Sequence, residues 1–115
     1  MPAAESKALL AAEDWGPALV SAIAELETAV RDRAAVSPGD PVSLARLLRS
    51  PALPFDRPLR DRLRRWLTMR NRHVHKGIHV APISARCAVS DVQRAIGELP
   101  AQAILPGDLD LKERP

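Results

Sequence analysis

The residues whose side chains are best suited to catalysis lie together in one short stretch, LTMRNRHVHKG, at positions 67–77. Histidine titrates near neutral pH, so His75 could take a proton from a 2′-hydroxyl or give one to a leaving oxygen. Arg70 carries a planar fork of donors that matches phosphate oxygens and offsets the negative charge that builds on them. Asn71 could orient either group through neutral hydrogen bonds. Together, these residues suit the cleavage of an RNA phosphodiester without a metal ion or another cofactor.

Helical geometry divides this stretch between two faces. Arg70 continues the apolar series of positions 59, 63, 66 and 74, so it should point toward a packed or interfacial side, where a lone charge is costly. Asn71 and His75 are four residues apart and should share another face. Arg70 and His75 are about 140° apart on a regular helix. A joint site therefore requires that the helix ends or bends near Val74, or that a second chain contributes.

A purely structural interpretation of the same stretch is that it forms the solvated, basic end of a helix, where the helix dipole favours positive charge. The charge distribution supports a wider binding role, because eight basic residues and one acid lie between positions 57 and 76, although the net charge is only +3. Such a local basic surface attracts polyanions. The residues that we predict to bind nucleic acid are Arg62, Arg65, Arg72, His73 and Lys76.

The composition and periodicity predict an all-α fold, since alanine, leucine and arginine are abundant and no stretch alternates as a strand would. We expect one domain over residues 1–115, a compact bundle of four main helices with a short leading helix at 4–14. The main helices are predicted at 18–35, 42–50, 57–75 and 85–99. Residues 100–115 are expected to form a loose tail.

Capping signals mark the predicted helix ends. Pro17 and Pro41 are expected at first helical positions, with Asp40, Asp56 and Ser84 as N-caps and Gly77 as a left-handed stop. Apolar spacing predicts the inward side chains, whereas Glu25 and the other charges of its helix should lie mostly off the apolar stripe. These inward residues are Leu19, Ile23, Leu26, Val30, Leu59, Leu63, Trp66, Leu67, Val74, Val89, Val92, Ile96 and Leu99.

Several other kinds of site are disfavoured by the sequence. Cys87 is the only cysteine, which rules out an internal disulfide, and it is expected to be a small buried residue. His73, His75 and His79 lack the carboxylates and spacing of a recognisable metal site. The N-terminal stretch does not look like a signal peptide and no apolar run is long enough to cross a membrane, so a cytoplasmic protein is expected.

The stretch LTMRNRHVHKG resembles the Arg-Asn-x-x-x-His signature of HEPN domains (higher eukaryotes and prokaryotes nucleotide-binding domains). The likeness extends over about residues 17–99, because a helix like ALVSAIAELETAVRDRAA precedes the motif and the connector IHVAPIS leads to a final helix. Arg70 and His75 match the two catalytic positions of the family, and Asn71 matches the polar residue between them. His73 is an addition.

The resemblance implies a helical, metal-independent endoribonuclease, of the kind found in toxin–antitoxin and other conflict systems, with a cleft formed by the motifs of a homodimer. It also implies RNA as a partner, and an antitoxin or a neighbouring nucleotidyltransferase as further candidates. The chain has no tyrosine for a nucleotidyltransferase to modify. Two alternatives remain: a non-catalytic HEPN-like module that binds RNA, a nucleotide or a protein, and an assembly module in which Arg70 pairs with a carboxylate across a dimer.

Overall fold

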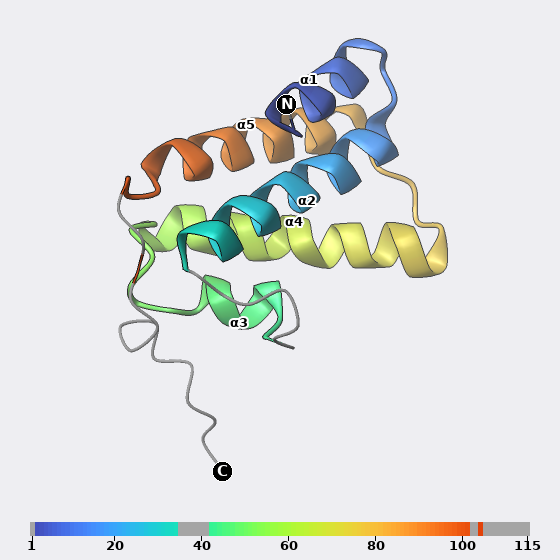
Figure 1. The fold of residues 1–115 in the computed structure, drawn as a ribbon. Helices are drawn as coiled ribbons and strands as arrows, with labels where there is room; N and C mark the ends of the chain where they lie inside the picture. Colours follow the sequence, from blue (N-terminus) through green and yellow to red (C-terminus); the bar gives the residue numbers. More distant parts are fainter. Residues whose placement is uncertain (1, 35–41, 102–103, 105–115) are drawn as a thin grey trace.

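The computed structural model describes residues 2–34, 42–101 and 104. All the regular secondary structure within those residues is helical, which confirms the predicted all-α bundle (Figure 1). The predicted leading helix forms, but it ends at Ala11. The five helices are α1 (Pro2–Ala11), α2 (Trp15–Arg33), α3 (Leu44–Leu48), α4 (Arg57–Lys76) and α5 (Pro82–Glu98).

The second helix occupies the middle of the bundle. Both α1 and α5 pack against α2, and α4 packs against α2 and α5 from the other side (Figure 1). The short α3 contacts α4, and it lies beside the N-terminal half of that helix. The C-terminal half of α4, which carries the Arg-Asn-x-x-x-His stretch, therefore runs on past α3. No described helix is long and apolar enough to cross a membrane.

The core forms where the apolar stripes of the helices meet. The stripe of α2 is fully buried as predicted, and α4 and α5 add their own buried leucine, tryptophan, valine and alanine side chains. Ile96 and Leu99 are half-buried at the margin of this core. The buried residues of the predicted stripes are Leu19, Ile23, Leu26, Val30, Leu59, Leu63, Trp66, Leu67, Val89 and Val92.

Glu25 corrects one expectation, because its side chain is buried rather than turned away from the core. Its carboxylate accepts hydrogen bonds from the backbone N–H of Ser6 (3.0 Å) and from the Ser6 hydroxyl (2.7 Å). The Ser21 hydroxyl (3.3 Å) and the Gln93 side-chain amide (3.2 Å) also donate to it. These four donors satisfy a buried charge that would otherwise be costly, and they join α1, α2 and α5.

The start of α3 differs from the prediction. The N-cap is Ser43, whose hydroxyl accepts from the backbone N–H of Arg46 (3.2 Å), so the helix covers 44–48 instead of 42–50. The predicted Asp40 cap and Pro41 lie outside the described residues. The loop from α3 to α4 is held by Arg60, whose burial lowers the pKa of its guanidinium. Its donors reach the carbonyl oxygens of Leu48, Ser50, Leu53 and Phe55.

Two further differences from the prediction lie at helix starts. Pro17 lies inside the first turn of α2, which begins two residues earlier at Trp15. The last helix begins at Pro82 after an extended Ala81, so the predicted N-cap Ser84 lies within its first turn. A proline at the first helical position loses no hydrogen bond and has a helical φ angle already set. Pro82 therefore starts α5 without the Ser84 side chain.

The expected loose tail has one firm attachment. Ile104 is buried against the core, and its backbone N–H donates to the carbonyl oxygen of Arg33 at 2.6 Å. This contact corrects the prediction at that residue, whereas residues 102–103 and 105–115 lie outside the described part. The chain after α5 therefore returns to the end of α2.

Candidate active site

The helix that carries the motif has both predicted caps. At its start, the Asp56 carboxylate accepts from the backbone N–H of Leu59 (2.8 Å), and Pro58 lies in the first turn. At its end, Gly77 adopts the left-handed conformation (φ 65°, ψ 22°), and its N–H donates to the His73 carbonyl oxygen. The helix is therefore continuous through the whole motif and ends only after Lys76.

Arg70 lies on the side of α4 that faces the core. It continues the stripe of Leu59, Leu63 and Trp66, and its side chain is half-buried. Its Nε is fully buried and has no hydrogen-bond partner among the described residues. A buried N–H without an acceptor costs free energy. Arg70 therefore has one buried donor for which the described part of the chain supplies no acceptor.

Asn71 and His75 are exposed on a different face of the same helix. They are four residues apart on a continuous helix and share a face, as predicted. Because α4 continues regularly to Lys76, His75 remains about 140° around the helix from Arg70. The structure thus shows no helix end near Val74 that would unite Arg70 with His75, and a contribution from a second chain stays a prediction.

His73 has a structural environment that the sequence did not indicate. Its Nδ1 lies 2.8 Å from the Ile78 carbonyl oxygen, so Nδ1 carries the proton and donates it. Its ring lies against Gly16 at the start of α2, where an added Cβ would be only 2.4 Å from Nε2. His73 thus ties the end of α4 to α2 and to the connector before α5. These contacts of His73 position the C-terminal end of α4 against α2 and the connector.

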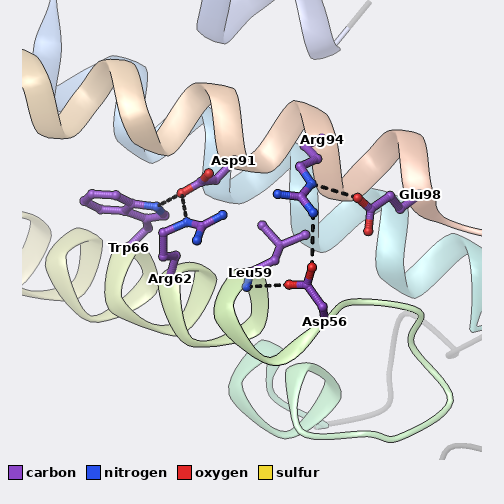
Figure 2. A network of polar contacts seen from close by, with 7 residues as sticks. All are labelled: Asp56, Leu59, Arg62, Trp66, Asp91, Arg94 and Glu98. Carbon is purple, nitrogen blue, oxygen red and sulfur yellow. Dashed lines mark hydrogen bonds and ion pairs between the residues drawn. The ribbon is translucent and has the colours of Figure 1, made fainter.

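The arginines and the lysine that were predicted to bind nucleic acid differ in whether they form ion pairs within the chain. The Nε of Arg62 donates to Asp91 (3.1 Å), and the same carboxylate accepts from the Trp66 indole (2.8 Å), as Figure 2 shows. Arg62 is therefore committed to the contact between α4 and α5. The exposed residues Arg65, Arg72 and Lys76 form no ion pair within the described part of the chain.

A second polar bridge lies further along the same two helices. Arg94 of α5 donates to Asp56 (3.2 Å) and to Glu98 (2.8 Å), and Asp56 in turn caps α4 (Figure 2). The hydrogen bond and charge of Glu98, with a smaller contribution from Asp56, raise the pKa of Arg94. Asp56, Asp91 and Glu98 are therefore paired with Arg62 and Arg94, and not with the basic residues nearer the motif.

Three large apolar side chains are exposed around the end of the motif helix. They are Val74 (53% exposed), Ile78 (50%) and Ile83 (65%). Val74 was predicted to face the core, and its helical position does continue the buried stripe, but the bundle does not extend far enough to cover it. The apolar stripe of α4 thus continues onto the surface next to Arg70.

Cys87 is exposed, which corrects the prediction of a buried residue. It lines a concavity of about 430 Å³ between α4 and α5, together with Arg86, Ser90 and the Arg62–Asp91 pair. The sequence interpretation missed Arg86 because it considered only the basic cluster of α4. Its signal was the spacing of polar residues at 86, 87, 90 and 91, which follows one face of a helix.

Metal ligation has no support from the side-chain positions. Among the residues that the structure describes, no three histidine, cysteine, aspartate or glutamate side chains gather into a group that could hold an ion. His79 is exposed in the connector and lines a second concavity with Arg65 and Arg72.

No protein-family model matches this sequence, and comparisons with curated proteins and with solved structures also return no match. The HEPN resemblance therefore depends on the motif and the helix order. The catalytic positions, the RNA-binding residues and the antitoxin or nucleotidyltransferase partners all stay predictions.

Proposed function

We propose that this protein is a metal-independent endoribonuclease of HEPN type whose active site is completed by a second copy of the chain. The observation that carries the proposal is Arg70, a half-buried arginine on the core-facing stripe of α4 whose buried Nε, like that of Arg33 at the end of α2, has no hydrogen-bond partner among the described residues. A surface arginine chosen only for solubility would have its donors in water. An anionic ligand at the margin of the core would give this one its missing acceptor.

The proposed chemistry uses His75 and Arg70 in separate roles. His75 removes the proton from an RNA 2′-hydroxyl, and the oxygen attacks the adjacent phosphorus. The bond to the 5′ oxygen breaks, that oxygen takes up a proton from water, and a 2′,3′-cyclic phosphate remains. Arg70 stabilises the negative charge on the phosphate during attack, and Asn71 orients the phosphate or the imidazole. These roles fit the exposure of Asn71 and His75 and the buried Nε of Arg70, which has no acceptor in the part of the chain that the structure describes.

The need for two chains follows from the continuous helix. One copy of α4 presents Arg70 and His75 on faces about 140° apart, so one phosphate between two copies would contact Arg70 of one chain and His75 of the other. The exposed Val74, Ile78 and Ile83 supply apolar surface at that end of the molecule, which association would bury.

The activity can be tested directly by incubating the purified protein with mixed RNA in excess chelator. We expect cleavage with cyclic phosphate ends, and a loss of rate of about 10²-fold or more in His75→Ala, since general acid–base help is worth that much. His75 is exposed and makes no hydrogen bond in the described structure, so the variant should fold normally.

Two results would contradict the enzyme assignment. If wild type cuts no faster than His75→Ala across many RNAs, the proposal fails. Salt-sensitive RNA binding without any cleavage would instead identify a non-catalytic module, because phosphate contacts alone produce that behaviour.

A further inference from the structure

The flank of α4 that faces α5 and the connector has two neighbouring concavities with basic linings. The first, about 430 Å³, is bordered by Arg62, Arg65 and Arg86 with Trp66 beneath. The second, about 310 Å³, is bordered by Arg65, Arg72 and His79 with Thr68 and Met69. Because Arg65 belongs to both linings, the two concavities form one basic track along the helix.

The cations of this track differ in whether they are available. Arg62 is held by Asp91, as described above. Arg65 and Arg72 are exposed, and neither takes part in any ion pair among the described residues. They are seven residues apart on α4, which separates their backbones by about 10 Å along the helix. The track thus offers spaced, unneutralised guanidinium groups.

Arg86 provides a second kind of contact. Its guanidinium carbon lies 5.1 Å from the ring centroid of Trp15, within the range of a cation–π interaction. Trp15 is half-buried, so it holds the guanidinium in place, and Arg86 itself remains exposed. The outer face of an arginine fixed in this way can stack on a nucleobase, and its edge can donate to phosphate.

We propose that this track binds the backbone of single-stranded RNA, with Arg65, Arg72 and Arg86 as the phosphate and base contacts and with Arg62 excluded. This inference rests on the proposed function in one respect, because the track leads toward His75, the residue that would remove the proton from the 2′-hydroxyl. Thr68, in the second concavity, is about 20° from His75 around α4, and Arg72 about 60°. A strand in the track would therefore approach His75 on the side away from Arg70 of the same chain.

Single-stranded RNA suits the track better than a duplex or an acidic peptide. Each concavity has the volume of a small-ligand site, which accepts one nucleotide unit but not a rigid double helix. The Trp15–Arg86 pair offers a flat face on which nucleobases can stack, whereas an acidic peptide without aromatic side chains has no group for it. Binding should thus depend on both charge and bases.

The test is fluorescence anisotropy of the full protein with a 5′-labelled, mixed-sequence 12-nucleotide 2′-O-methyl RNA, which lacks the attacking hydroxyl and cannot be cleaved. We expect Arg65→Gln/Arg86→Gln to weaken binding by about tenfold or more, because two charge-assisted contacts are lost. The slope of log K against log salt should fall by about 1.4, at about 0.7 per phosphate contact on a single strand. Arg49→Gln/Arg57→Gln, which removes two exposed arginines that line a concavity near α3, is the charge-matched control and should leave both unchanged.

Three results would overturn the inference. The inference fails if the double variant binds like the Arg49→Gln/Arg57→Gln control, if a duplex of the same sequence binds more tightly than the single strand, or if oligoglutamate of equal charge competes as well as unlabelled RNA. The two proposals can fail separately. If the double variant loses RNA binding and wild type cleaves no RNA, the binding track is supported and the endoribonuclease proposal is contradicted. If wild type cleaves natural RNA and the double substitution does not change the rate, the endoribonuclease proposal is supported and the binding track is contradicted.

Discussion

Arg70→Met should abolish most of the RNA cleavage while leaving the fold at least as stable as before. Loss of one charge-stabilising donor typically slows a reaction by about 10²–10³-fold. Stability should not fall, because the substitution removes a buried Nε that has no acceptor among the described residues and keeps a flexible apolar side chain at the site. We expect the free energy of unfolding to rise by up to about 1 kcal/mol.

These opposite effects separate a functional arginine from a structural one. Cleavage rates and urea unfolding should be measured for Arg70→Met and for Arg64→Met, an exposed arginine on the same helix that should change stability little. A loss of more than about 1 kcal/mol in Arg70→Met, or weaker self-association, would mean that Arg70 makes a structural ion pair across a dimer. Cleavage at the wild-type rate would remove Arg70 from the mechanism.

The largest stability effect should come from Glu25→Ala. The carboxylate of Glu25 accepts from Ser6, Ser21 and Gln93, and its removal leaves the buried donors of Ser6 and the half-buried donors of Ser21 and Gln93 without this acceptor. We expect a loss of about 3 kcal/mol, which is a large fraction of the 5–15 kcal/mol typical of a folded domain. Chemical denaturation followed by circular dichroism measures this difference.

Glu27→Ala provides a matched control on the same helix. Glu27 is only half-buried and pairs with Arg31 at 2.9 Å in an i, i+4 arrangement, which is worth about 0.3–0.5 kcal/mol. If Glu25→Ala costs no more than Glu27→Ala, the contact of α1 with α2 and α5 through Glu25 does not stabilise the fold. Equal effects would also remove Glu25 as the anchor of the N-terminal helix.

The helices were predictable where local signals were sufficient. Apolar spacing identified α2, α4 and α5, and Asp56 and Gly77 marked both ends of the motif helix because capping depends on a few neighbouring residues. The start of α5 was misassigned because Pro82 and Ser84 are both good local signals, and only the structure shows that the helix begins at the proline.

Features that depend on which elements pack together were not predictable. Helical spacing placed Glu25 off the apolar stripe. Its burial depends on partners in α1 and α5 that lie far away in the sequence. Val74 has the helical spacing of a core residue, but periodicity gives a direction and not the presence of a neighbour to cover it. The polar spacing around Arg86 indicates a shared face of α5, but only the fold brings that face alongside α4.

Within the candidate site, the sequence predicted the split between Arg70 and the Asn71–His75 pair from helical geometry alone. The structure adds that α4 stays regular to Lys76, so one chain does not bring the two groups together. It also adds the contacts of His73 with Gly16 and Ile78, which helical spacing could not indicate.

The most direct test of the composite site is the activity of a heterodimer of Arg70→Ala and His75→Ala chains, isolated through two different affinity tags. If each site combines Arg70 of one chain with His75 of the other, the heterodimer contains one intact site of two and should show about half of the wild-type activity, although each variant alone is inactive. If the heterodimer is as inactive as the two single variants, the composite site is contradicted.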